Sequence, residues 1–397
     1  MWASVKKKED DNKQLLASWV RELKLDVKGK LLVYAMCNLA REDHEALKPA
    51  ADWSIFDGIF TSSEAGFRKP ELGFYKKTLA AIGADPAEVV FVDDVPENML
   101  SARSMGMQAL CFQQDDNKTK NSSRLILQQI KNLTSDPIQR GRDFLLSNAK
   151  QMHSISNTGH TFRDSFSQLL LLEATQNRNL VDIEQHPRTW NFFIDKPVLT
   201  TDSFPDDLDC TAVAWTVLEP EPRLITSVLD EIVGSWVNSD GIVMTYFDHT
   251  RPRVDPVVCV NVLRLFYKYG RGHELSATLQ WVRDVLYHRA YLEGTRYYAP
   301  PEAFLYLLSH LGNILRERVM ERVGAPGDSI CLAMRLLACQ SLGISNPVDL
   351  LTLRTIQCED GGWEAGWIYL YGSADIRIGN RGLTTALAVN ALSKGKI

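Results

Sequence analysis

The sequence predicts two domains of different classes: an α/β domain over residues 1–125 and an all-α domain, an α/α-barrel, over residues 138–397. Three observations lead to this prediction. The chain of 397 residues is longer than one ordinary hydrophobic core supports. Strand-like and helical runs alternate in the first part, as in α/β folds. Beyond residue 138 only helical periodicity continues, which indicates an all-helical fold.

The predicted strands of the first domain are short apolar runs rich in β-branched or aromatic residues. They lie at Lys30–Met36, Gly58–Thr61, Val89–Val92 and Gln108–Phe112. Helical patterns lie between them at Leu72–Ile82 and Glu97–Met105. Because strands and helices alternate, we expect a parallel, doubly wound sheet. The polar run Asp115–Arg124 predicts a loop or linker near the domain boundary.

The second domain shows helical periodicity interrupted by segments rich in Gly, Pro and Asp. The clearest helical stretches are Thr211–Leu218, Val257–Tyr269, Ala303–Arg318 and Ile330–Leu342. A helix, a loop and another helix recur every roughly 40 to 50 residues, which predicts an α-helical repeat or α/α-barrel rather than a bundle.

Composition narrows the classes of function. The net charge of −5 gives no basic face, which argues against a nucleic-acid partner. No apolar run reaches the roughly 18 residues that span a bilayer, and the start of the chain lacks the apolar core of a signal peptide. The seven cysteines form no Cys-x-x-Cys pair, so we expect reduced thiols in a cytoplasmic protein. The composition is compatible with a homo-oligomer as well as with a monomer.

The segment Ser203–Trp215 (SFPDDLDCTAVAW) holds closely spaced acids at a predicted helix start. One reading is that these acids only stabilise the positive end of the helix. The other is catalytic, because a carboxyl held near another carboxyl in a dry site can stay protonated and donate its proton. The spacing places Asp207 and Asp209 two residues apart, followed by apolar residues.

This segment resembles the acid motif DxDD(T/A) of class II terpene cyclases. It is still more similar to the DxDTT variant of drimane-type sesquiterpene cyclases, which fuse a haloacid-dehalogenase-like (HAD-like) domain to a cyclase β domain. The resemblance implies that Asp209 is the general acid and that Asp207, with Thr211, orients it and tunes its acidity. Cys210 departs from both forms of the motif.

A second signature, Gln357–Trp363 (QCEDGGW), fits the QxxxGxW repeat of triterpene and diterpene cyclase barrels. In that family its Gln and Trp tie helix ends together, so it indicates fold and adds no catalytic residue.

Between the two motifs, Tyr246–Asp255 (YFDHTRPRVD) combines aromatic, basic and acidic residues. Arginine pairs bind phosphate oxygens bidentately, and aromatic faces stabilise a carbocation. The predicted substrate-binding residues are Arg251, Arg253, Lys268, Arg271, Trp215, Tyr246 and Phe247; further aromatic candidates are Trp236, Tyr297, Tyr298 and Trp367. A solvated loop and ordinary core aromatics are the alternative readings.

The first domain resembles the HAD family over about residues 25–115. In Val89–Asn98 (VVFVDDVPEN) the resemblance implies Mg²⁺-binding acids at Asp93 and Asp94, and Lys69 would neutralise a phosphoryl group. Cys37 replaces the hydroxyl residue of another motif, and no strand ending in Asp-x-Asp precedes Lys30. Phosphoryl transfer in that family needs this nucleophile, so we expect a structural role; a truncated gene model is the alternative.

The combined resemblance implies protonation-initiated cyclisation of farnesyl diphosphate to a bicyclic drimane-type diphosphate. The diphosphate, chelated by Mg²⁺, is expected to stay attached, and a separate phosphatase is expected to act on the product. The rivals are a bifunctional cyclase-phosphatase that releases a drimane alcohol, a HAD-type phosphatase or dehalogenase, and a non-catalytic terpenoid-binding protein. Asp93–Glu97 (DDVPE) also mimics an ionisation-initiated (class I) motif, but it follows a predicted strand rather than lying on a helix.

Overall fold

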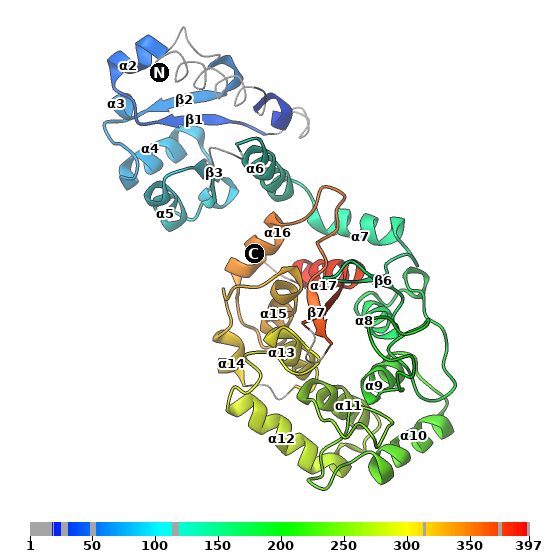
Figure 1. The fold of residues 1–397 in the computed structure, drawn as a ribbon. Helices are drawn as coiled ribbons and strands as arrows, with labels where there is room; N and C mark the ends of the chain where they lie inside the picture. The colour runs from blue at the N-terminus through cyan, green and yellow to red at the C-terminus, as the bar shows by residue number, and fades with distance from the viewer. Residues whose placement is uncertain are drawn as a thin grey trace. The chain divides into compact units, whose positions relative to one another are not determined.

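The computed structural model describes residues 18, 20–24, 31–47, 53–112, 119–312, 315–371 and 375–394. The chain divides into two compact units, Met1–Ser135 and Asp136–Ile397, here called the first and the second unit (Figure 1). No helix in the described parts is both long and apolar enough to cross a membrane.

The first unit alternates strands and helices, as predicted. Strand β1 pairs with β2 and strand β3 pairs with β4, both in parallel. Tyr75, Leu79, Met99 and Ala102 pack together as its core, from α4 and α5. The elements are β1 (Tyr34–Cys37), α2 (Arg41–Leu47), β2 (Gly58–Thr61), α3 (Ser62–Ala65), α4 (Leu72–Ile82), β3 (Val90–Asp93), α5 (Pro96–Ser104), β4 (Gln108–Cys111) and α6 (Thr119–Thr134).

Two expectations for this unit need correction. The described strands form two separate two-stranded sheets instead of one continuous sheet. The linker predicted at Asp115–Arg124 is also wrong from Thr119 onward, because α6 begins there; residues 113–118 lie outside the described ranges. The buried residues Ile126 and Leu127 anchor this helix, which extends back through the polar run.

The second unit is built on a closed ring of six inner helices. In order around the ring, α8, α9, α11, α13, α15 and α17 each contact the next, and α17 returns to α8. Figure 1 shows the ring, with α10, α12, α14 and α16 outside it. The helices are α7 (Pro137–Ser147), α8 (Ser165–Thr175), α9 (Leu208–Val217), α10 (Pro222–Ser235), α11 (Pro256–Lys268), α12 (Ser276–Tyr287), α13 (Pro301–Ser309), α14 (Arg316–Met320), α15 (Ser329–Ser341), α16 (Pro347–Thr355) and α17 (Arg381–Lys394).

The unit is an α/α-barrel, but it is not all-α as predicted. Four short strands, which the sequence analysis did not predict, form one sheet in the order β6-β5-β8-β7. They are β5 (Ser154–Ser156), β6 (Thr161–Phe162), β7 (Trp367–Leu370) and β8 (Arg377–Asn380). The single helix predicted at Ala303–Arg318 is two helices, α13 and α14, and Gly312 between them has a positive φ of 77°.

Contacts between distant parts of the sequence close the ring. β5 pairs antiparallel with β8. Gln357 Nε2 donates to the carbonyl of Pro137 at 2.9 Å, where α7 begins, and to that of Gly361 at 2.7 Å. Trp363 Nε1 donates to the Leu353 carbonyl in α16 at 2.7 Å. The QxxxGxW residues therefore tie helix ends together.

Aspartates begin four of the six inner helices. The carboxylates of Asp164, Asp207, Asp255 and Asp328 accept hydrogen bonds from the first free N–H groups of α8, α9, α11 and α15. The segments before these helices are linked to one another, since Asp207 forms isolated β-bridges with both Trp190 and Tyr246. The starts of α8, α9 and α11 thus lie around one end of the ring.

Candidate active site

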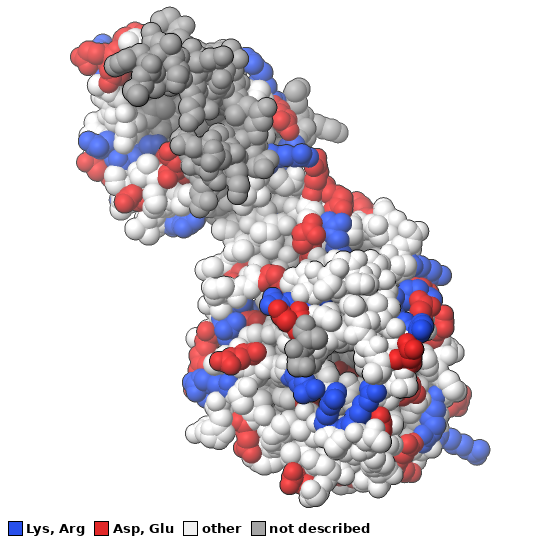
Figure 2. Space-filling model, viewed as in Figure 1, with Lys and Arg blue, Asp and Glu red and all other residues white. Residues whose placement is uncertain are grey.

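A cavity of about 370 Å³ lies at this end of the ring, a size typical of small-molecule sites. Its wall combines aromatic residues with two acids and three arginines. The lining residues include Phe166, Phe192, Phe204, Asp207, Asp209, Cys210, Thr245, Tyr246, Arg251, Arg253, Arg296, Tyr297, Tyr298, Tyr369 and Tyr371. Figure 2 shows a hollow in one face of the second unit with Lys and Arg side chains beside it.

The two acids of the motif both line the cavity and are almost fully buried, Asp207 at 5% exposure and Asp209 at 8%. Asp207 is the N-cap of α9, and its Oδ1 accepts a hydrogen bond from the N–H of Cys210 at 2.6 Å. Asp209 is bound by side chains from α11 and from the segment before α13. Its Oδ1 accepts from Asn261 Nδ2 at 2.7 Å, and its Oδ2 accepts from the Tyr298 hydroxyl.

Burial makes both carboxyls hard to ionise. It raises the pKa of Asp209 to about 7, although the hydrogen bonds from Tyr298 and Asn261 lower it. Burial also raises the pKa of Asp207 well above its ordinary value, and the nearby charge of Asp209 adds to the effect. Both shifts favour the protonated forms, and interacting carboxyls titrate as a pair. The pair is therefore suited to donate a proton within the cavity.

A chain of polar residues fixes the amide that contacts Asp209. Arg264 Nη1 donates to Asn261 Oδ1 at 3.1 Å, so the amide turns its NH₂ group toward the acid. Arg264 is itself paired with Glu173. Asn261 and Arg264 lie one turn apart in the buried, mostly apolar part of α11.

The aromatic part of the wall is made of rings in mutual contact. Tyr369 packs against Phe166 and Phe192 with ring centroids 5.2 and 5.4 Å apart. Tyr246 packs against Phe204 and Tyr297 at 5.8 and 5.9 Å. Aromatic faces stabilise a cation without offering it a lone pair to attack, so this wall suits a carbocation.

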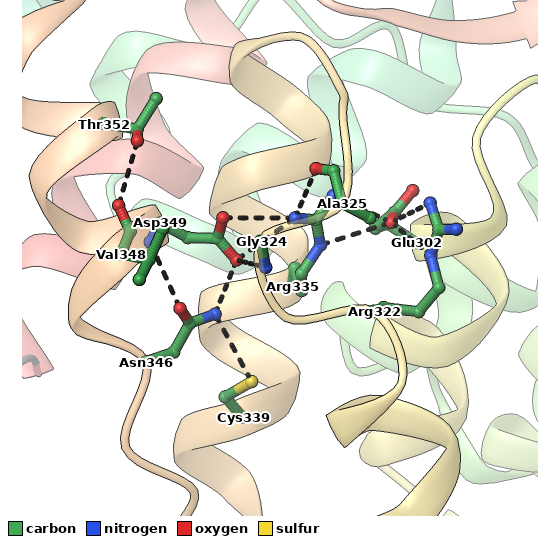
Figure 3. Close-up of polar contacts among 10 residues, drawn as sticks. All are labelled: Glu302, Arg322, Gly324, Ala325, Arg335, Cys339, Asn346, Val348, Asp349 and Thr352. Carbon is green, nitrogen blue, oxygen red and sulfur yellow. Dashed lines mark hydrogen bonds and ion pairs between the residues drawn. The ribbon is translucent and has the colours of Figure 1, made fainter. Parts of the chain in front are cut away.

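The three arginines of the cavity differ from arginines that hold the fold together. Arg335 is completely buried between Asp349 and Glu302, with ion-pair distances of 3.1 and 3.0 Å (Figure 3). Among the described residues, by contrast, no carboxylate lies within ion-pair distance of Arg253 or Arg296, and Arg251 has only Asp248 at 3.4 Å. Positive charge at the cavity is thus free to bind an anion.

Several residues predicted for the site lie elsewhere. Thr211 is two positions after Asp209 on α9, so it faces another direction and bonds to the backbone of Asp207 and Trp190. The indole of Trp215 donates to the Arg188 carbonyl. Phe247 alternates with Tyr246 and packs on Trp236. None of the three lines the cavity.

The basic residues predicted at the end of α11 also lie away from the cavity. The cavity is at the start of this helix, whose 13 residues span roughly 20 Å. Lys268, in its last turn, donates to the Thr216 carbonyl, and Arg271, just beyond it, pairs with Glu274 and Asp230. The geometry therefore gives neither residue a role in binding diphosphate.

The metal site expected at Asp93 and Asp94 does not fit the structure. Asp93 Oδ2 contacts the Lys69 ammonium at 2.7 Å, while its Oδ1 accepts hydrogen bonds from Asn98 and Val95. Burial alone would raise the pKa of Asp93, but these bonds lower it below its ordinary value. The described residues contain no group of three or more His, Cys, Asp or Glu side chains that could hold a metal ion. The charge of Asp93 is thus neutralised by Lys69 in this structure.

Sequence reasoning missed several residues that line the cavity or, like Asn261, contact its acid. Asn261 could have been noticed as a lone amide in an apolar run (VVCVNVLRLF), and Arg296 as part of an Arg-Tyr-Tyr segment before a predicted helix. Tyr369 and Tyr371 gave no signal, because the strand that carries Tyr369 was not predicted.

Comparison with known proteins identifies relatives for most of the chain. A sequence profile described as the sesquiterpene cyclase astC-like C-terminal domain matches residues 138–269. The chain is 41% identical to sesquiterpene phosphatase astK from Aspergillus oryzae over 97 residues, 24% of this chain and 47% of that protein. Among solved structures, type II terpene cyclase MstE from Scytonema aligns with a TM-score of 0.48 and 12% identity, over 68% of this chain and 98% of that one.

The similarity to drimenol cyclase drtB from Aspergillus calidoustus is far more extensive. The two sequences are 47% identical over 390 residues, which cover 95% of this chain and 72% of that protein. The chain therefore belongs to the sesquiterpene cyclase family that includes this drimenol cyclase.

Proposed function

We propose that the protein is a class II sesquiterpene cyclase that converts farnesyl diphosphate into a bicyclic drimane-type diphosphate. The observation that carries this proposal is the buried pair Asp207 and Asp209 at the wall of an aromatic cavity, where burial raises the pKa of both carboxyls. Family membership supports the reaction class, and the size of the cavity suits a ligand of this kind.

Asp209 is the proposed acid. It protonates the terminal double bond of the substrate, the internal double bonds then close two rings, and loss of a proton ends the reaction. Asn261 and Tyr298 hold its two oxygens in place. Burial disfavours premature ionisation of Asp209, and the charge of Asp255 adds to this effect. The aromatic wall keeps water out while it stabilises the moving cation.

The cavity arginines are the proposed diphosphate site. Arg253 and Arg296 carry positive charge without carboxylate partners among the described residues, and Arg251 lies over the rings of Phe204 and Tyr246. Mg²⁺ would accompany the diphosphate as part of the substrate and neutralise some of its charge. We assign the metal no ligand in this chain.

We further propose that the product keeps its diphosphate and that a separate phosphatase removes it. No described strand of the first unit ends in an Asp-x-Asp motif, and its Lys69 is neutralised by Asp93. The seven free cysteines suit a reducing compartment, which favours the cytoplasm as the place of the reaction.

A second candidate is favoured by the relative's name. Drimenol is an alcohol, so drimenol cyclase drtB is named for a product without diphosphate. In this reading the whole protein both cyclises and removes the diphosphate.

One assay separates the candidates. Purified protein is incubated with farnesyl or geranylgeranyl diphosphate, with and without added phosphatase, and the products are identified by mass spectrometry. We expect a bicyclic C15 alcohol only after phosphatase is added. The same alcohol without added phosphatase would establish the second candidate, and absence of any cyclic product would refute the cyclase assignment.

A further inference from the structure

Tyr369 lines the cavity, and the mechanism above does not use its buried hydroxyl. Its side chain is only 6% exposed, and its hydroxyl has no hydrogen-bond partner among the described residues. A buried hydroxyl without a partner costs stability. Such a group in a native fold calls for an explanation, of which a catalytic role is one.

A β-bulge in β7 lies directly before this side chain. β7 pairs with β8, but the register shifts between Trp367 and Tyr369, so that one extra residue is accommodated there. On its other edge Tyr369 forms an isolated bridge with Tyr298, the residue whose hydroxyl contacts Asp209. Such bulges often redirect a side chain next to an active site. The strand that carries the bulge therefore places Tyr369 beside Tyr298, whose hydroxyl contacts the acid.

The reaction needs a base close to its acid. Cyclisation leaves a tertiary cation, and a neighbouring C–H bond must give up its proton. In a product of two fused six-membered rings, the carbon protonated first and the carbon that loses the last proton are only the width of the two rings apart. The base therefore has to lie within about the width of the bicyclic product from Asp209.

We propose that the Tyr369 hydroxyl accepts the proton that ends the cyclisation; this inference rests on the proposed function. The electron pair of the C–H bond becomes the new double bond, and the proton goes to a lone pair of the phenol oxygen. The phenol then gives a proton to the Asp209 carboxylate. One proton is taken from Asp209 and one is returned, so the acid is ready for the next turnover.

The surrounding charges favour this role. Burial raises the pKa of Tyr369 well above its ordinary value, and the charge of Asp209 adds to it, so the residue remains a neutral phenol with free lone pairs. Once Asp209 has lost its proton, its negative charge favours positive charge on neighbouring groups, including a protonated phenol. The base becomes effective only after the acid has acted.

Thr245 is the rival. Its hydroxyl is also buried, lines the cavity and has no partner among the described residues. Its backbone N–H donates to the carbonyl of Arg253 at 2.8 Å, and its carbonyl accepts from the N–H of Leu208 at 2.8 Å, so it lies between the proposed diphosphate site and the start of α9. Unlike Tyr369, it forms no backbone bridge with Tyr298 among the described residues.

The test compares Tyr369→Phe with two matched variants in the full chain. Tyr369→Phe removes a hydroxyl without a partner, so we expect an unchanged or higher melting temperature. We also expect at least a tenfold loss of the main bicyclic product and a larger share of double-bond isomers or water-captured products. In Tyr371→Phe, a lining tyrosine whose hydroxyl donates to the Val198 carbonyl at 3.1 Å, the melting temperature falls and the product ratio stays the same.

The third variant is Thr245→Val, which should leave the product ratio unchanged. Wild-type rate and product ratio in Tyr369→Phe would overturn the inference while the proposed function stands. A changed ratio in Thr245→Val alone would overturn it as well. If wild-type protein makes no bicyclic product, the proposed function fails first and this inference fails with it.

Discussion

Two aspartate pairs, one in each unit, show how surroundings decide what a carboxyl can do. Asp93 of the first unit contacts the Lys69 ammonium, and its pKa is lowered. Asp209 of the second unit has only the neutral donors Asn261 and Tyr298, and burial raises its pKa to about 7. The first carboxyl is a fixed anion and the second an acid. A cation in contact, more than the spacing of the acids, makes the difference.

The largest expected effect follows from removing the acid. Asp209→Asn keeps the size of the side chain but has no acidic proton, so cyclisation of farnesyl diphosphate should fall about 1,000-fold or more. Asp93→Asn is the matched control and should leave the rate unchanged. Product formation is followed by gas chromatography after phosphatase treatment. Equal losses in the two variants would mean that the two pairs do not differ in function.

The next effect concerns the arginines at the cavity. Arg253→Ala and Arg296→Ala should each raise KM for farnesyl diphosphate about tenfold to a hundredfold with little change in kcat, because charge-assisted bonds to the diphosphate are lost. Lys268→Ala, at the far end of α11, should leave KM unchanged. Steady-state kinetics at constant ionic strength distinguishes these outcomes, and a similar rise in all three variants would point to bulk charge instead.

The pH profile sharpens the contrast in acidity. Catalysis needs protonated Asp209, so kcat should fall as pH rises through about 7. Tyr298→Phe removes a hydrogen bond that lowers the pKa of Asp209, and the falling limb should therefore move to higher pH by about one unit. Lys69→Met should leave the limb in place. If the fall of kcat occurs at the same pH in Tyr298→Phe as in wild type, a group other than Asp209 determines it.

The smallest effect on cyclisation is expected in the first unit. Lys69→Met leaves Asp93 buried without its cation, which should lower the stability of the first unit by about 2 kcal/mol and leave cyclisation unchanged. Because the lowered pKa of Asp93 adds stability above about pH 4 and loses it as pH falls, the difference from wild type should shrink in acid. Urea unfolding at pH 7 and pH 3 measures the difference in unfolding free energy between the variant and wild type. If this difference is the same at both pH values, the ion pair is not its source.

How much the sequence predicts depends on how local each feature is. Asp207 and Asp209 share one motif, and Arg251, Arg253 and Tyr246 share one segment, so short patterns were enough to select them. Asn261 and Tyr298 lie 52 and 89 residues from Asp209 along the chain, and only the ring brings them to it. Thr211 and Phe247 were selected for their proximity in sequence, but helix and strand geometry turns them away.

The closure of the ring has a consequence for the order of folding. β5 finds its partner β8 only after more than 200 residues have intervened, and Gln357 joins α7 across a gap of 220. Contacts of such long range form late and slowly. During synthesis, α8 and α9 are made long before α17, so the apolar face that α8 packs against α17 stays uncovered until the end of the chain is made. The paired strands of the first unit are close in sequence, so they can pair before the second unit is made. The dry cavity around Asp209 is therefore among the last parts of the protein to exist, and the acid acquires its raised pKa only when the chain is nearly complete.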